Sequence, residues 1–395
     1  MNRYCSVIEL SKSPFGYEVG TGKRLAVLRA QTASADVDRA IAEIAEGLSS
    51  GSASEPSVTL LFCSPKYDLA QLGRKVAKAF PGPIISCTTA GQLGQNGYQQ
   101  GGITAVSLTS PELVVTPYLI SPLAECQARA SEVAFSAMSG LLGRGSASAF
   151  GLVLVDGLAR AEERLAASLY QSLSGVPLIG GSAGDELAFQ ETHVYYEGRF
   201  LRDAAVFALF ETTLPFATFK VQHVVPGRRK LVVTGADPEQ RVVFEFNGEP
   251  AAEVYAEALG VEVDELDSLV FSRSPLMLRS GDDSYIRSVK SRGDDHSLTF
   301  FCGLEEGLVL TVGEASDPLV ALQRGFDDAR LKVEEPAVVL ACDCVLRRLE
   351  FEHSGIAGSV GEFMAKNGAV GFSTYGEQFN AIHVNQTLTA VAIGG

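Results

Sequence analysis

The sequence predicts a mixed α/β protein, with β-α-β-α-β-β units forming mixed sheets that helices cover. Short apolar runs of strand length alternate with segments whose apolar residues recur at helical spacing. This order returns at intervals of about 100 residues, which is typical of duplicated units and too long for a solenoid. The strand-and-turn segments 83–93 and 177–187 also align without a gap, and segment 369–378 matches both.

The first unit begins with a strand and then a helix that Ser34 or Asp36 can cap, because short oxygen-bearing side chains accept hydrogen bonds from the first turn. Asp68 is the expected cap of the second helix. The expected elements, in order, are strand 24–29, helix 37–48, strand 58–62, a helix from 69 to 80, strand-and-turn 83–93, and strands 103–108 and 113–120.

Two further units follow the same order. Asp317 and Pro318 open a helix in the third unit, since proline is favoured at the first helical position. The expected elements of the second unit are helix 124–142, strand 150–155, a helix with Leu165, Leu169 and Leu173, turn 177–187, and strands 193–196 and 204–210. Those of the third are a helix from 317, strand 337–341, helix 360–365, strand-and-turn 369–378 and strand 384–393.

A β-rich stretch, 216–313, separates the second and third units, and one helix near Pro250 interrupts it. We therefore expect three parts: an N-terminal arm over 1–23, a region over 24–225 with two related units, and a region over 226–395 that holds the β-rich part and the third unit. The length of 395 residues accommodates two or three domains.

Composition excludes several classes of function. The formal net charge is −15, so the protein repels phosphate backbones and anionic membranes over roughly 8 Å. No run approaches the ~18 apolar residues of a membrane span, and residues 1–10 lack the apolar run of a signal peptide. Seven scattered cysteines show no disulfide spacing, which predicts a reducing, cytoplasmic location.

The turn segments and two later motifs resemble the FIST family, with an N-terminal and a C-terminal FIST region, and the likeness spans roughly 24–395. The residues that carry it lie in 87–93, 180–185, 342–348, 371–377 and 383–387. The resemblance implies a small-ligand sensor in bacterial or archaeal signalling, partnered with a histidine kinase or a cyclic-di-GMP enzyme (diguanylate cyclase or phosphodiesterase). We see no fused kinase or cyclase segment, so we expect a separate partner protein.

One branch that the layout resembles is the haem-containing nitric-oxide sensors, in which a histidine binds the iron. That resemblance singles out His193, the residue eleven positions after Ser182, as the iron ligand of haem b. Imidazole is a usual axial donor to haem iron, and the aromatic residues near His193 in sequence would have to form an apolar wall. They are Phe189, Tyr195, Tyr196, Phe200 and Phe207. His383, ten positions after Ser373, occupies the related place in the third unit.

Each unit also places a hydroxyl at the same position of its turn: Thr88, Ser182 and Ser373. Gly180–Gly184 satisfies the G-x-S-x-G pattern of a serine nucleophile, but strand and loop follow it where that motif requires a helix. A hydroxyl that recurs in every unit is more simply a turn residue that bonds its own backbone. A serine hydrolase using Ser182 is therefore the alternative from another class.

Two carboxylates accompany the hydroxyls, Asp185 in the second turn and Glu377 in the third. We interpret both as turn caps or ligand contacts, because no second carboxylate at a defined spacing indicates acid–base catalysis. The predicted ligand-binding residues are thus Thr88, Ser182, Asp185, Ser373, Glu377 and His383, and no catalytic set is predicted. The leading hypothesis is a haem-based nitric-oxide sensor, and a non-haem sensor of an amino acid or similar metabolite is the other alternative.

Overall fold

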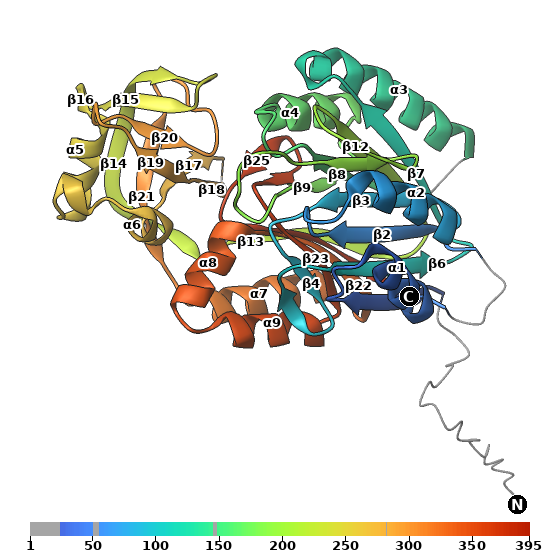
Figure 1. The fold of residues 1–395 in the computed structure, drawn as a ribbon. Coiled ribbons are helices and arrows are strands. Elements are labelled where there is room, and N and C mark those ends of the chain that lie inside the picture. Colours follow the sequence, from blue (N-terminus) through green and yellow to red (C-terminus); the bar gives the residue numbers. More distant parts are fainter. Residues whose placement is uncertain (1–23, 50–54, 145–147, 282) are drawn as a thin grey trace, which may run out of the picture.

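The computed structural model describes residues 24–49, 55–144, 148–281 and 283–395, and the predicted N-terminal arm over 1–23 lies outside them. The mixed α/β class is confirmed. Figure 1 shows a large body of sheets and helices beside a smaller β-rich part. In the described part of the chain, no helix is both long and apolar enough to cross a membrane.

Three related units build the large body, and each has the order strand, helix, strand, helix, strand, hairpin, strand. The first is β1 (Ala26–Thr32), α1 (Val37–Gly47), β2 (Val58–Cys63), α2 (Leu69–Ala79), β3 (Ile84–Thr88), β4 (Gln92–Gly94), β5 (Gly97–Gln99) and β6 (Ile103–Thr109). The second is β7 (Leu113–Ile120), α3 (Cys126–Arg144), β8 (Ser148–Val155), α4 (Glu162–Ser172), β9 (Leu178–Ser182), β10 (Val194–Tyr196), β11 (Arg199–Leu201) and β12 (Ala205–Thr212).

The third unit follows the same order with one extra helix. It is β13 (Phe216–Val221), α7 (Pro318–Arg330), β22 (Pro336–Cys344), α8 (Val345–His353), α9 (Ala357–Lys366), β23 (Ala369–Thr374), β24 (Glu377–Phe379), β25 (Ile382–Val384) and β26 (Leu388–Gly394). The predicted helix starts are confirmed, because Asp36, Asp68 and Asp317 each accept hydrogen bonds from first-turn amides.

The three sheets exchange their hairpins in a cycle. Hairpin β4–β5 of the first unit pairs with β23 of the third, β24–β25 of the third pairs with β9 of the second, and β10–β11 of the second pairs with β3 of the first. The strand orders are β1-β6-β2-β3-β10-β11, β25-β24-β9-β8-β12-β7 and β13-β26-β22-β23-β4-β5. In each sheet, therefore, the hairpin of a neighbouring unit completes one edge. We call the three interlocked units the threefold core.

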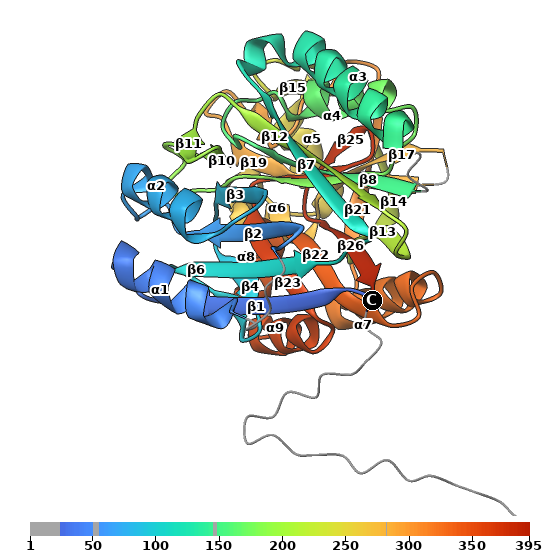
Figure 2. The same ribbon diagram turned by 90° about the vertical axis from the view of Figure 1, so that its right-hand side faces the viewer.

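The inner faces of the three sheets pack against one another. A single apolar cluster joins residues of all three sheets, among them Phe62, Phe210 and Phe372, each at most 3% exposed. Helices α1 and α2, α3 and α4, and α7 and α9 lie on the three outer sides (Figure 2). The threefold core is thus held mainly by burial of apolar area at its centre, the dominant favourable contribution to folding.

The small part is an insertion between β13 and α7 of the third unit, and we call residues 222–316 the insert. One continuous set of strands, in the order β18-β17-β21-β14-β15-β20-β19 with β16 beside β15, forms it around its own apolar cluster. Its elements are β14 (Val224–Asp237), β15 (Val242–Phe246), β16 (Glu249–Pro250), α5 (Ala251–Leu259), α6 (Ser268–Arg273), β17 (Leu276–Ser280), β18 (Asp283–Arg287), β19 (Val289–Arg292), β20 (Leu298–Phe300) and β21 (Val309–Ala315).

Three features differ from the sequence prediction. The single strand expected over 384–393 is two strands, β25 and β26, because 385–387 form a polar turn in which Gln386 has a left-handed φ of 46°. Helix α8 was not predicted. The sheets also group the chain differently from the boundary expected after 225, since β13 pairs with β26 at the far end of the chain and the insert begins after it.

Candidate functional site

The three strand-end turns, which the sequence places about 100 residues apart, meet at one place. Each pair of turns is joined by a backbone hydrogen bond: Gly184 N to Thr88 O at 3.0 Å, Ala90 N to Ser373 O at 3.0 Å, and Tyr375 N to Ser182 O at 3.1 Å. These contacts follow from the hairpin exchange, since each hairpin begins immediately after a turn. The turns are therefore one structure made from three units.

The three hydroxyl residues have the same backbone role. The amides of Thr88, Ser182 and Ser373 donate to the carbonyls of His193, Gly376 and Gly91, the residues that precede the incoming hairpins. All three hydroxyl residues are 0% exposed. The Thr88 hydroxyl accepts from His193 N at 3.0 Å, while that of Ser373 has no hydrogen-bond partner among the described residues.

The geometry around Ser182 does not favour a nucleophile. Its hydroxyl accepts a hydrogen bond from Gln378 Nε2 at 3.1 Å, and Gln378 in turn lies 3.4 Å from His383 Nδ1. A carboxamide cannot take up the serine proton at neutral pH, so no general base among the described residues contacts the hydroxyl. Strand β9 also continues into a loop, without the helix that follows a nucleophile elbow.

Asp185 organises the loop between β9 and β10. Its carboxylate accepts hydrogen bonds from the amides of Phe189, Gln190 and Glu191 at 2.6–3.0 Å, and also from the Tyr375 hydroxyl. Burial alone would raise the pKa of Asp185, but these hydrogen bonds outweigh it and the pKa lies below its ordinary value. Asp185 thus caps its own loop.

Glu377 begins β24 and is fully buried. Thr374 donates its hydroxyl to Oε1, and the amide of Thr387 donates to Oε2 at 3.2 Å. Burial raises the pKa of Glu377 well above its ordinary value, and the nearby carboxylate of Asp343 raises it further. Both effects favour the protonated form of this side chain over the form that an exposed glutamate would adopt.

The two histidines do not occupy related places. Cross-strand pairing in the hairpins makes His383 the counterpart of Tyr98 and Phe200. His193 precedes its hairpin, where the other units have Gly91 and Gly376. The His383 ring is buried between the amides of Gln378 and Asn385, each 3.4 Å away, and burial lowers its pKa, so it stays neutral.

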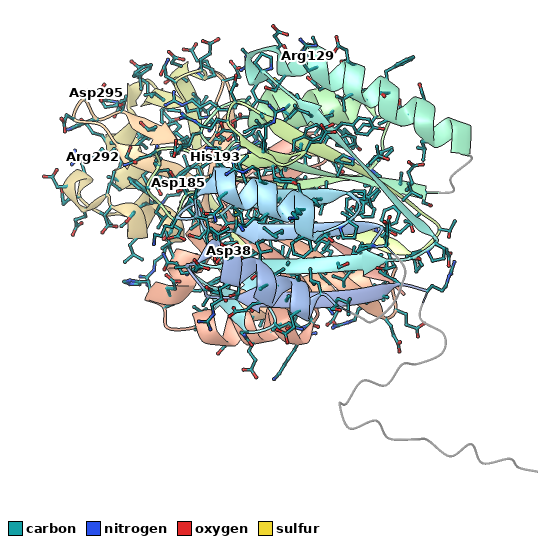
Figure 3. All side chains as sticks on the ribbon, turned by 45° about the vertical axis from the view of Figure 1, so that its right-hand side comes forward. Asp38, Arg129, Asp185, His193, Arg292 and Asp295 are labelled. Carbon is teal, nitrogen blue, oxygen red and sulfur yellow. The ribbon has the colours of Figure 1, made fainter. Side chains whose placement is uncertain are left out.

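The surroundings of His193 do not fit a haem. The ring is half-buried, its Nδ1 has no hydrogen-bond partner among the residues that the structure describes, and burial lowers its pKa. The aromatic residues expected around it belong to separate places: Tyr195 packs under the helices of the first unit, Tyr196 on the central cluster and Phe207 beneath α3 and α4. Charged side chains, including Asp185 and Arg202, face the ring instead. Figure 3 labels Asp185 and His193 on the side of the core toward the insert.

A cleft runs between the threefold core and the insert. Three hollows form it, and neighbouring hollows share lining residues. An apolar compartment of about 290 Å³ is lined by Leu187, Phe189, Phe271, Leu346 and Leu349, among others. A central compartment of about 400 Å³ is lined by Arg160, Arg202, Arg241, Lys290 and Tyr375, among others. An outer compartment of about 540 Å³ follows beyond Arg160 and Arg241.

Lys290 separates the first two compartments. Its ammonium lies 5.2 Å from the centre of the Phe189 ring and 6.0 Å from that of Phe301, within reach of a cation–π interaction. The other face of Phe189 stacks on Tyr375 at 4.7 Å. Partial burial lowers the pKa of Lys290, as do the positive charges of Arg160 and Arg241.

The cations of the central compartment differ in their partners. Arg241, from the insert, pairs with Glu162 at 2.6 Å and Glu163 at 2.8 Å, both from α4 of the core. Arg160 donates to the amide oxygen of Gln240, at 3.2 Å. Within the described ranges, neither Arg160 nor Lys290 forms an ion pair with a carboxylate, so the compartment retains uncompensated positive charge.

None of the seven residues predicted from sequence lines this cleft, but several immediate neighbours do. Leu187 and Phe189 follow Asp185, and Tyr375 lies between Ser373 and Glu377. Sequence reasoning missed Lys290 and Arg160 altogether. A usable signal was the length of the second turn: His193 follows Ser182 by eleven positions, where Gly376 follows Ser373 by three.

No group of three or more metal-ligating side chains occurs in the portion that the structure describes. The fold and the site define a mixed α/β protein of three interlocked units, with an inserted β region that forms one wall of a cleft. The chain belongs to the FIST family: residues 57–249 match the FIST N domain and residues 251–380 match the FIST C domain. FIST domains are associated with small-ligand sensing in signal transduction.

A curated relative, the uncharacterized protein MJ1623 of Methanocaldococcus jannaschii, is 24% identical to this chain over 259 residues. The similarity covers 58% of this chain and 49% of the relative. The chain therefore spans about half the length of that relative.

Proposed function

We propose that this protein is a sensor that binds a small ligand in the cleft between the threefold core and the insert. The observation that carries the proposal is that the places where the units depart from their common pattern, the long second turn, the insert and the extra helix α8, border the same cleft. The long second turn supplies Leu187 and Phe189, and the insert in the third unit supplies Lys290 and Phe301. Pockets of some 300–1,000 Å³ with apolar walls and a few polar groups are typical ligand sites.

Backbone strain at the cleft supports the same location. Arg160, Leu187 and Phe189 all line it, and all have left-handed φ angles, of 52°, 70° and 51°. Such conformations cost on the order of 1–3 kcal/mol each in residues other than glycine and cluster at binding sites. The Asp185 carboxylate, which accepts from three amides of this loop, offsets part of that cost.

We propose further that ligand binding changes the position of the insert relative to the core. The insert joins the core through two chain segments, and Ser316 N and Oγ both donate to His223 O, each at 2.7 Å, so that the segments are tied together. Arg347, fully buried in α8, contacts His223 Nδ1 at 3.1 Å. A ligand that contacts both walls binds one arrangement better than the other and shifts the population toward it.

The output of this change is proposed to pass to a separate signalling enzyme, a histidine kinase or a diguanylate cyclase or phosphodiesterase. The association of FIST domains with signal transduction supports this part of the proposal. We propose binding and not turnover, because the hydroxyl of Ser182 is buried and lacks a contacting base.

The narrower prediction of haem b and nitric-oxide sensing stays a prediction. A haem held by His193 would give the purified protein a Soret absorbance band that His193→Ala shifts or weakens. The polar surroundings of His193 lead us to expect no such band, and a metabolite ligand without haem agrees better with the cleft. A band that depends on His193 would contradict the proposed location of the site.

The location can be tested by filling the apolar compartment. Ser268 is exposed at the start of α6 and lines that compartment, so Ser268→Trp should block it without disturbing the core. In a thermal-shift screen of metabolites, a ligand that raises the Tm of the wild type by several degrees should do little for Ser268→Trp. The matched control is Ser131→Trp, an exposed serine of α3, which should respond like the wild type. Equal stabilisation of both variants would rule out the cleft.

A further inference from the structure

The charge of the central compartment is opposite to that of the whole protein. The chain carries 47 acidic and 32 basic residues, yet four basic side chains and one carboxylate, Glu162, line this compartment. The pairing of Arg241 with Glu162 and Glu163 and of Arg202 with Glu191 leaves two of those four cations without a carboxylate among the described residues. Those two, Arg160 and Lys290, are both exposed to solvent in the cleft and reachable by a ligand.

The adjoining compartment has the opposite chemistry. Its lining is mainly apolar, with Leu187, Phe271, Leu346 and Leu349 around a hollow of about 290 Å³. Phe189, Phe301 and Lys290 line both compartments. A ligand that bridges them therefore meets an apolar chamber at one end, the two aromatic rings and Lys290 in the middle, and Arg160 at the other end.

We propose, on the basis of the sensing function proposed above, that the ligand is a small organic anion with a flat unsaturated ring. Its carboxylate, phosphate or sulfonate group binds Lys290 and Arg160, and its ring lies in the apolar compartment beside Phe189. The anion neutralises these two cations, which form no ion pair with a carboxylate among the described residues. Charge-assisted hydrogen bonds of this kind are roughly twice as strong as neutral ones. The ring gains from burial and from stacking with aromatic side chains.

The low pKa of Lys290 agrees with this assignment. Partial burial, and after it the positive charges of Arg160 and Arg241, disfavour the protonated amine in the free protein. A bound anion removes that penalty, so binding and protonation of Lys290 support each other. The groups that act on the ammonium are these two arginines and the rings of Phe189 and Phe301.

Two dyes with the same ring system separate the charge from the apolar contribution. 8-Anilinonaphthalene-1-sulfonate carries a sulfonate, and N-phenyl-1-naphthylamine is its uncharged counterpart. Fluorescence titration of the full chain should show saturable binding of one sulfonate dye per protein, at least about tenfold tighter than the uncharged dye. Added salt should weaken binding of the sulfonate dye alone, because ions that enter an open cleft screen the attraction between the sulfonate and the two cations.

Variants assign the effect to residues. Lys290→Met should weaken binding of the sulfonate dye about tenfold and leave the uncharged dye unchanged, and Lys290→Arg should restore it. Lys75→Met, which removes a cation paired with Asp38 on the outer face of α2, is the matched control and should change neither. Circular dichroism and the Tm of each variant establish that it is folded.

The outcomes distinguish the two proposals. Equal binding of both dyes, or no effect of Lys290→Met on the sulfonate dye, overturns the anionic ligand. If the uncharged dye nevertheless binds and Ser268→Trp abolishes its binding, the cleft remains the site and only the ligand class is wrong. If neither dye binds the wild type, and no metabolite stabilises it through the cleft, both proposals are overturned.

Discussion

The first unit of the threefold core differs from the second and third in the segments that connect its strands and helices. In the first, three positions separate Thr88 from the residue before its hairpin, and nothing is inserted. The second has an eleven-position turn at the same point, and the third has the whole insert between β13 and α7. Because both additions border the cleft, the comparison teaches that the repeated architecture supplies the scaffold and the departures from it supply the binding surface.

The regular and added regions also differ in how they are packed. Residues of the central cluster are nearly all inaccessible, whereas Phe189 in the added turn is 40% exposed and stacks on a single ring. Close packing makes the first set intolerant of lost volume. Truncation of a side chain that lines an open cleft should cost less stability, because that side chain buries less apolar area.

Truncation of a central aromatic residue should have the largest effect on the free energy of unfolding. A small effect would contradict the difference in packing between the central cluster and the added turn. Phe372 is 0% exposed and stacks on Phe62 at 4.7 Å, so Phe372→Ala should lower the free energy of unfolding by about 3–5 kcal/mol. Phe189→Ala, the matched change in the added turn, should cost much less. Urea unfolding measures both, and equal losses would mean that the two regions are not packed differently.

An intermediate effect is expected from Asp185→Ala, which removes the acceptor of the added turn. Three amides and the Tyr375 hydroxyl lose their partner, a loss of about 1–3 kcal/mol. The disruption should stay local, since the neighbouring strands pair independently. Hydrogen exchange should accelerate at the amides of 189–191 and remain slow in β9, and uniform acceleration would show that the turn is part of the core.

The pKa of Asp185 gives this prediction a pH dependence. The pKa of Asp185 is lower in the folded state than in the unfolded state. Its ionised carboxylate therefore contributes to the free energy of unfolding above the unfolded-state pKa of about 3.9, and this contribution is lost as the pH falls through the folded-state pKa. Wild-type protein should therefore lose stability below about pH 4 more steeply than Asp185→Asn. Parallel acid-unfolding curves would contradict the role of the carboxylate.

The smallest effect is expected at Glu377 near pH 5, and this residue occupies the hairpin position that Gln92 holds in the first unit. Glu377→Gln keeps an acceptor for the Thr387 amide, and its Nε2 can donate to the Thr374 hydroxyl, which then acts as the acceptor, so stability near pH 5 should change by less than about 1 kcal/mol. The substitution gives the third hairpin the glutamine that the first hairpin has at this position, so it tests whether the two hairpins tolerate the same residue there.

The sign of the pH effect at Glu377 is opposite to that at Asp185. A raised folded pKa means that the contribution of Glu377 is complete below the unfolded value of about 4.3 and is lost as the pH rises through the folded value. Glu377→Gln should therefore become more stable than wild type at alkaline pH, by urea unfolding. Exposed Glu46, changed to Gln, is the control. Identical slopes for wild type and Glu377→Gln would show that Glu377 is ionised in the fold.

The regular part of the fold follows from local patterns. The apolar run at 58–62 became β2, Asp36, Asp68 and Asp317 cap their helices, and the alignment of the three turns correctly indicated related units. These features depend on periodicity and capping within a few residues, which a single sequence contains.

The exchange of hairpins and the cleft depend on contacts that no local pattern records. Each exchanged strand is only three residues long, too short for a recognisable alternation. The longer second turn displaced His193 from the alignment, so that His193 and His383 were matched wrongly. Lys290 follows a buried residue on β19 and meets Phe189 from 101 positions away in the chain. Only the folded chain brings such residues together.

The cyclic exchange of hairpins has a consequence for synthesis on the ribosome. Strand β9 cannot pair with β24 until nearly 200 further residues have been synthesised, and β4 and its partner β23 are separated by an even longer stretch of chain. Until β23 and β24 emerge, the nascent protein exposes unpaired strand edges that can aggregate. We expect the threefold core to form only after β23 and β24 have left the ribosome and to benefit from chaperones that shield those edges.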